Sequence, residues 1–256
     1  MTDKTLTYKN MRKKQYIWIG ILSFSFCFGH IFAQKPPSSF YIDIDGNKKS
    51  FLFKEEISID DYADVLGVIK QEYGEDSEGY KSLFPDTAKF RIIYGFPFFY
   101  MEKGDHYHAI DSIRKLCRFL PMVGISYEQA KVYCQWMETF FNDERLKNKY
   151  IWQCRLPEKA DYETAFNSGK AKITQKKSLS SLQNRYFCYK YAINATICRH
   201  KRSDNRIYGL TDNVAEYTQD GMVVAGGENA VLKFVEANDS ETPIGFRIKA
   251  TIVSKK

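Results

Sequence analysis

The chain has 256 residues, of which 44% are hydrophobic and 16% aromatic, and its formal net charge is +7. This composition excludes a polytopic membrane protein, which needs several apolar runs of about 20 residues. So many aromatic side chains also exclude a wholly disordered chain. The net charge alone favours a polyanionic partner, so its distribution along the chain must be considered.

The first 33 residues are predicted to form a secretory signal peptide. They carry five basic side chains against the single acidic Asp3, so more than half of the net charge lies there. An apolar stretch from Tyr16 to Phe28 follows, and Ala33 is a small residue at its exit. This order is typical of a signal peptide, whose true start is either Met1 or Met11. We therefore expect an exported protein: periplasmic, outer-membrane-associated or secreted.

Two alternatives apply to this segment. An uncleaved N-terminal anchor is one, although Tyr16–Phe28 is short for a bilayer span. Lipidation of Cys27 is the other, but the preceding Phe24-Ser25-Phe26 lacks the small residues of a lipobox. Any membrane association is therefore expected only through an uncleaved N-terminal segment.

Export makes disulfides possible. The cysteines that follow the predicted signal peptide are Cys117, Cys134, Cys154, Cys188 and Cys198. Their odd number leaves at least one without a partner inside the chain. No CxxC pair occurs, which argues against a thioredoxin-like site and a cysteine-built zinc site. The alternative to redox chemistry is that several of them are small buried hydrophobic residues.

Residues 34–39 are predicted to form a linker, and the domain is expected to span 40–256. Residues 40–44 and 51–53 flank the turn signal Asp45-Gly46-Asn47 and predict a hairpin. Ser58 followed by Asp61 predicts a capped helix that Gly74 closes. Residues 75–90 are predicted to be a polar loop.

Ser126 followed by Gln129 predicts a second capped helix. Pro157 is expected in the first turn of a third helix, which Gly169 ends. Residues 168–206 are predicted to form a long polar excursion, and the predicted strands near the C-terminus are 222–224, 232–235 and 246–253. The order of elements predicts an α+β fold in a single domain, without a doubly wound sheet.

Five short segments occur in order along the chain: 121–130, 155–163, 209–218, Gly226-Gly227 and 245–247. Together they resemble the formylglycine-generating enzyme family, also called the sulfatase-modifying factor domain. The resemblance covers about residues 40–250 and implies a variant of the C-type lectin fold with much irregular structure. A shorter segment, 83–87, is similar to envelope members of this family that serve gliding motility and type IX secretion.

The sequence differs from the family pattern at the residues that carry the family's catalytic activity. The resemblance implies two copper-binding cysteines between the paired glycines and the Gly-Phe-Arg motif. Residues 228–244 contain no cysteine, and none follows Cys198. Without thiolates this segment offers no soft ligand for Cu(I), so copper and the family's oxidative activity are not expected.

The resemblance also implies a calcium loop. The candidate ligands are Asp212, Asn213 and Glu216 through side-chain oxygens and Val214 through its carbonyl, a set of hard oxygen donors that suits Ca²⁺. The loop is shorter than the family pattern. A tight polar turn, whose side chains cap backbone groups, is the alternative.

Two histidines form a weaker metal candidate. His106 and His108 would point the same way on a strand, but no third ligand is evident from the spacing, so a polar loop is the alternative. The basic stretch 170–177 is interpreted as a solvated loop rather than a nucleic-acid site.

These observations lead to one expected function and two alternatives. We expect an exported, non-catalytic domain that binds a protein or glycan partner at the bacterial cell envelope. One alternative is a metal-dependent oxidase with a relocated site, in which Cys188 or Cys198 supplies the thiolate. The other is a structural component of a secretion or gliding assembly.

Overall fold

The computed structural model describes the chain in segments. They are residues 41–44, 46–94, 98, 120–143, 148–168, 171–172, 207–210, 214–226, 232–237 and 243–256. The predicted signal peptide and linker lie outside them. Within the described segments, no helix is both long enough and apolar enough to cross a membrane.

The first sheet is antiparallel and joins both ends of the described chain. Its strand order is β1 (Tyr41–Asp43), β2 (Ser50–Phe53), β10 (Lys249–Lys255) and β3 (Tyr150–Arg155). The predicted hairpin is confirmed as the β1–β2 pair. The last strand of the chain thus lies between β2 and β3, and β3 itself was not predicted.

The two principal helices begin at the predicted capping boxes. Helix α3 (Ile59–Tyr73) is capped by Ser58 and Asp61 and ends at Gly74, whose φ is +85°. Helix α7 (Tyr127–Phe141) begins with the corresponding exchange between Ser126 and Gln129. Each box satisfies amide groups that the first turn leaves without helical partners.

The prediction of a loop over 75–90 is wrong. This stretch forms α4 (Glu78–Leu83) and α5 (Thr87–Tyr94). Ser77 caps α4, and the Asp86 carboxylate accepts hydrogen bonds from the first turn of α5. The segment is polar overall, but its few apolar residues are spaced to bury one helix face, and that spacing decides the structure.

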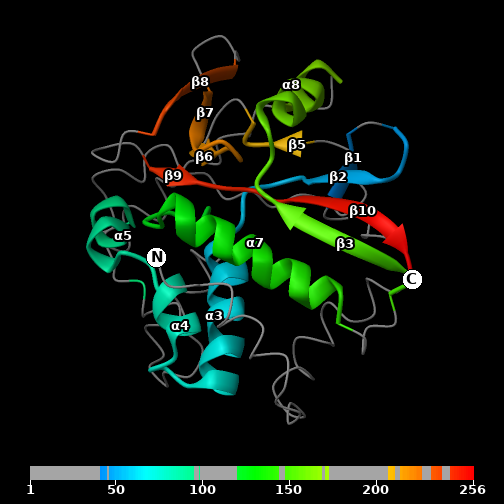
Figure 1. The fold of residues 1–256 in the computed structure, drawn as a ribbon. Coiled ribbons are helices and arrows are strands. Elements are labelled where there is room, and N and C mark those ends of the chain that lie inside the picture. The colour runs from blue at the N-terminus through cyan, green and yellow to red at the C-terminus, as the bar shows by residue number, and fades with distance from the viewer. Residues whose placement is uncertain are drawn as a thin grey trace.

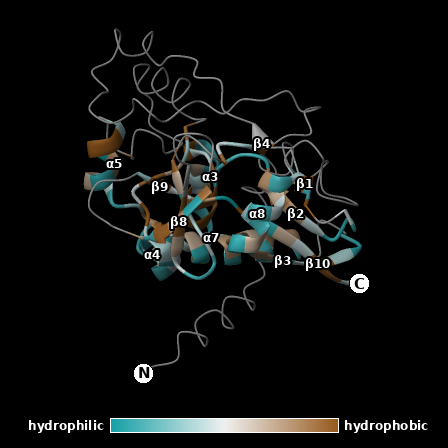
Figure 2. Ribbon diagram, turned by 90° about the horizontal axis from the view of Figure 1, so that it is seen from above, coloured by the Kyte–Doolittle hydropathy of each residue, from teal (hydrophilic) through white to brown (hydrophobic). Residues whose placement is uncertain are grey.

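Helix α5 also shows apolar surface on its outside. Part of its ribbon is brown, marking hydrophobic residues, in Figure 2. Ile92, in its last turn, is 60% exposed.

The second sheet is built from the C-terminal part of the chain. Its strand order is β8 (Leu232–Glu236), β7 (Met222–Gly226), β6 (Ala215–Tyr217) and β9 (Ile244–Gly245). The predicted strands at 222–224 and 232–235 are confirmed, whereas the one predicted from 246 begins only at Lys249.

Three smaller elements complete the described chain. The short strands β4 (Ala171–Lys172) and β5 (Ile207–Tyr208) pair in parallel. Helix α8 (Lys159–Asn167) has Glu158 as its N-cap, so Pro157 precedes the cap and does not occupy the first turn as predicted. Gly169 lies outside the described residues, as does most of the predicted excursion 168–206.

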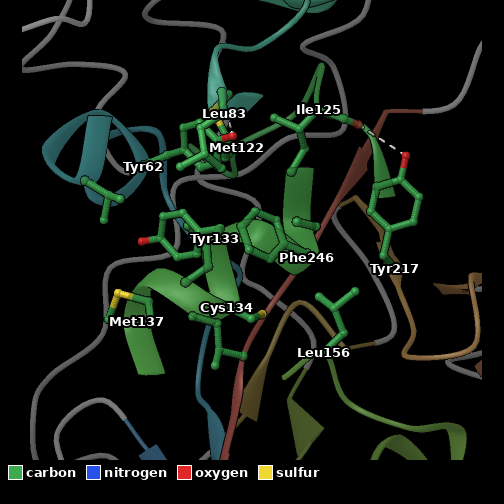
Figure 3. Close-up of a cluster of buried hydrophobic side chains, with 14 of the residues drawn as sticks. Tyr62, Leu83, Met122, Ile125, Tyr133, Cys134, Met137, Leu156, Tyr217 and Phe246 are labelled. Carbon is green, nitrogen blue, oxygen red and sulfur yellow. Dashed lines mark hydrogen bonds between the residues drawn. The ribbon is translucent and has the colours of Figure 1, made fainter. Parts of the chain in front are cut away.

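Two hydrophobic clusters form around the first sheet. The larger one contains the buried apolar faces of α3 and α7, and we call its centre, Tyr62, Tyr133 and Phe246, the aromatic core (Figure 3). Tyr62 and Tyr133 stack with ring centroids 5.2 Å apart, and the Phe246 ring lies nearly perpendicular to that of Tyr133, with centroids 5.3 Å apart. The smaller cluster includes Leu52, Tyr162 and Val224.

The elements form layers. In Figure 1, α3, α4 and α7 lie below the first sheet, while the second sheet and α8 lie above it. The α+β prediction is thus confirmed.

Candidate functional site

Buried charged side chains gather where the two sheets meet. We call Arg247, Glu216, Tyr162, Lys249 and Asp161 the ionic centre. The Arg247 Nε donates to Glu216 Oε2 at 2.6 Å, and its terminal nitrogen donates to Oε1. Both side chains are at most 2% exposed. This bidentate geometry is the strongest form of a carboxylate–guanidinium pair.

Tyr162 adds a third donor to the same carboxylate. Its hydroxyl lies 3.0 Å from Glu216 Oε2. Burial, and next the nearby Glu216 charge, raise the pKa of Tyr162 well above its ordinary value. The phenol therefore stays protonated and keeps its role as a donor.

The rest of the Arg247 guanidinium joins separate parts of the backbone. It donates to the carbonyls of Phe53 at 3.2 Å and Lys54 at 3.3 Å, at the end of β2. It also donates to the Tyr208 carbonyl in β5 at 2.9 Å. One side chain thus satisfies carbonyls from two strands and a carboxylate from a third.

A second buried ion pair lies two residues further along the chain. Lys249 Nζ lies 2.5 Å from Asp161 Oδ1, and each side chain is 9% exposed. The other oxygen of Asp161 accepts the backbone N–H of Glu158 at 2.8 Å, at the start of α8. This pair therefore attaches α8 to the first sheet.

Two consecutive glutamates border the ionic centre. Glu56 is 5% exposed, and a Cβ at position 209 would overlap its carboxylate; the φ of +70° at Gly209 also favours glycine there. Glu55 is half-buried. Burial, and then the charges of Glu56 and Asp61, raise its pKa to about 8, so Glu55 holds a proton at neutral pH.

The predicted calcium ligands are only partly described. Asp212 and Asn213 lie outside the described residues. Val214 is buried, and Glu216 lies in β6, a strand where a loop was expected. The Glu216 carboxylate is directed at Arg247, so in this geometry it does not fit a cation ligand. Calcium binding stays a prediction for the rest of the loop.

The other predicted metal ligands, His106 and His108, lie outside the described residues. In the segments that are described, no group of three or more His, Cys, Asp or Glu side chains is arranged to hold a metal.

Two of the five cysteines lie in the described segments, and both are buried. Cys134 belongs to the cluster around the aromatic core (Figure 3), and Cys154 lies on β3. Burial, above all, raises the pKa of both thiols well above the ordinary value. Because the thiolate is the reactive and metal-binding form, these two sulfurs are inert. Cys117, Cys188 and Cys198 lie outside the described residues.

The fold and the ionic centre together define an α+β domain in which distant motif segments meet. Glu216 comes from the segment 209–218 and Arg247 from the segment 245–247, two of the five that carried the family resemblance. The chain belongs to the sulfatase-modifying factor enzyme 1-like domain family, whose model matches residues 100–248. Searches of curated proteins and of solved structures gave no match.

The matched stretch is structurally continuous with its flanks. Strands β1 and β2 precede it, and β10 follows it, yet all three complete the first sheet with β3. The flanking strands therefore belong to the same sheet as the matched stretch.

Most of the ionic centre was not predicted from the sequence. Asp161, Tyr162 and Lys249 were not predicted as partners, although Asp161 and Tyr162 lie within the motif segment 155–163. The available signal was the charged or polar residue inside the motif segments 155–163, 209–218 and 245–247.

Proposed function

We propose that this chain is an exported, non-catalytic member of its family that binds a protein or glycan partner at the bacterial cell envelope. Family membership alone does not decide between catalysis and binding, because one fold hosts many functions. The proposal therefore depends on the residues that the family's chemistry needs.

One observation carries the non-catalytic part of the proposal. The chain has no cysteine after Cys198, so the interval 228–244 lacks both expected thiolates. The two described cysteines do not replace them, because both are buried in the core. Copper is therefore not expected as a cofactor.

A turnover assay tests this directly. The purified protein, with and without added Cu(I), is incubated aerobically with a cysteine-containing sulfatase-motif peptide, and aldehyde formation is followed by mass spectrometry. We expect no conversion above the protein-free control, with an active family member as the positive control. Conversion that disappears in a Cys188→Ser or Cys198→Ser variant, but not in Cys134→Ala, would establish the relocated oxidase instead.

The binding part of the proposal needs an identified partner. Reversible cross-linking in intact cells, followed by reciprocal tagging of each candidate, should return the same envelope partner in both directions. If the only stable complex contains components of a secretion or gliding assembly, the structural role is the correct one.

Export is tested by the mature N-terminus. We expect the protein recovered from the cell envelope to begin near Gln34, as cleavage of a signal peptide requires. A mature chain that retains residues 1–33 would show the uncleaved anchor.

Calcium remains part of the proposal for the loop at 211–213. We propose that Asp212, Asn213 and the Val214 carbonyl contribute oxygen ligands. Calorimetric titration of the purified protein with Ca²⁺ should give heat and a higher melting temperature, both reduced in Asp212→Ala. No heat and no change in melting temperature would exclude the site.

A further inference from the structure

Strand β8 is the outer strand of the second sheet. It pairs with β7 over five consecutive residues, from Leu232 to Glu236, with no shift of register. Figure 1 shows it on the far side of β7 from β6. Among the described residues, no hydrogen bond reaches the other edge of β8. The strand therefore presents a straight row of backbone donors and acceptors.

The corresponding edge of the first sheet is closed. On β3, the Trp152 N–H donates to Asn142 Oδ1 at 2.8 Å, and the Trp152 carbonyl accepts from Asn142 Nδ2 at 2.7 Å. The Cys154 N–H donates to Glu138 Oε2 at 3.0 Å. Side chains at the end of α7 thus take the place of a neighbouring strand, a common protection against unwanted pairing.

The remaining edges offer little length. Strand β1 has three residues and β9 has two. Just after β9, the Phe246 carbonyl accepts the Ile57 N–H at 2.8 Å. Among the described strands, β8 is therefore the one long edge without such protection.

The side chains of β8 separate into an anchoring face and an exposed face. Leu232 and Phe234 are half-buried against the smaller hydrophobic cluster. Lys233 is exposed and Val235 is 47% exposed, and both point to the opposite face because strand residues alternate. The anchored face holds the strand in place and leaves Lys233 and Val235 to meet side chains of an added strand.

The charges along this edge distinguish between possible occupants. Lys159 Nζ lies 5.0 Å from the centre of the Phe234 ring and therefore on the anchored face, so Lys233 is the positive charge on the exposed face of β8. In a two-fold antiparallel pair of β8 strands that continues the sheet, directly opposite residues share a face. Lys233 would then face Lys233, Val235 or Ala237 of the second copy and never Glu236. A second copy therefore offers no complementary charge.

We propose that the edge of β8 binds an extended strand of a partner protein that carries an acidic side chain opposite Lys233 and an apolar one opposite Val235. Main-chain hydrogen bonds supply affinity that does not depend on the partner's sequence, and the two side-chain positions supply the selectivity. The inference rests on the proposed binding function and specifies where that function is located.

The test uses a synthetic probe strand and the full chain. The probe is a fluorescent peptide, Thr-Val-Thr-Glu-Thr-Val-Thr, and its control has the same side chains with alternate amides N-methylated. We expect saturable binding of the probe by anisotropy, at least tenfold weaker binding of the control, and slowed amide exchange at 232–236. The amides of Trp152 and Cys154 serve as an internal reference, since they are bonded already.

Two matched variants separate the β8 edge from general surface effects. Val235→Lys places a charge on the open edge and should weaken probe binding at least tenfold. Ile151→Lys makes a similar change on the closed strand β3, where Ile151 is 40% exposed, and should change binding less than twofold. Lys233→Glu should weaken binding of the probe and strengthen binding of a peptide with Lys in place of its Glu. Circular dichroism and melting temperature confirm that each variant folds.

Three results would overturn the proposal: no saturable binding, equal binding of the N-methylated control, or equal effects of Val235→Lys and Ile151→Lys. A dimer in sedimentation velocity that Val235→Lys dissociates would assign the edge to a second copy and also overturn it. None of these results bears on the turnover assay, so failure here is distinguishable from failure of the non-catalytic proposal.

Discussion

The aromatic core and the ionic centre contain residues that are adjacent in the sequence, but their polar atoms are hydrogen-bonded differently. Phe246 packs into the aromatic core, while Arg247 enters the ionic centre. In the aromatic core a hydroxyl such as that of Tyr62 makes one hydrogen bond, to the Leu83 carbonyl at 2.6 Å. In the ionic centre, every nitrogen of Arg247 is bonded to a carbonyl or to Glu216. Removal of one polar atom should therefore break a single hydrogen bond in the aromatic core. In the ionic centre it should disturb several hydrogen bonds and lower the free energy of unfolding more.

The largest expected effect is that of Glu216→Gln. The substitution leaves the Arg247 charge buried without its counter-charge, which costs about 3–5 kcal/mol of unfolding free energy. Urea denaturation monitored by tryptophan fluorescence measures it. In a double-mutant cycle with Arg247→Met, the two losses should be strongly non-additive. A loss below about 1 kcal/mol would contradict the expectation that the ionic centre is more sensitive than the aromatic core.

Gly209→Ala should have the next largest effect. Its Cβ would overlap the buried Glu56 carboxylate, and its φ of +70° disfavours any side chain. We expect a loss of about 1–3 kcal/mol. Gly67→Ala is the matched control, because Gly67 lies inside α3 with nothing within 4 Å of the added Cβ, and it should stabilise by about 0.5–1 kcal/mol. Equal effects of the two substitutions would show that the Glu56 contact is unimportant.

Tyr62→Phe should have a smaller effect in the aromatic core. It removes the hydroxyl that donates to the Leu83 carbonyl but keeps the ring stacked on Tyr133. We expect a loss of about 0.5–1.5 kcal/mol in the same denaturation experiment. A loss as large as that of Glu216→Gln would mean that the two regions respond alike.

Glu55→Gln should change the pH dependence more than the stability itself. The unfolded chain releases the Glu55 proton near 4.5, whereas the folded chain keeps it to about 8. The stabilising contribution is therefore complete below about pH 4.5 and is lost as the pH rises to about 8. Melting temperatures between pH 5 and 9 should fall less steeply in the variant. Glu75→Gln, at a side chain that is 65% exposed, should leave the profile unchanged.

The helical part of the aromatic core could be predicted from the sequence, whereas the place of Phe246 in that core and the ionic centre could not. The apolar stripes of α3 and α7 repeat at helical spacing, and the capping residues lie three positions apart, so local pattern reveals both. Glu216 and Arg247 are 31 residues apart, and Lys249 and Asp161 are 88 apart. No local spacing joins them. Strand β3 was missed for a related reason: its sheet partner β10 lies about 100 residues further along the chain.

The place of β10 has a consequence for the order of folding. Strands β1, β2 and β3 lie within residues 41–155. In the sheet, β2 and β3 are joined through β10, residues 249–255. The first sheet cannot close until β10 is in place. Its pairing with β2 spans about 200 residues of chain, and such distant contacts form slowly. Closure of the first sheet must therefore wait for its last strand.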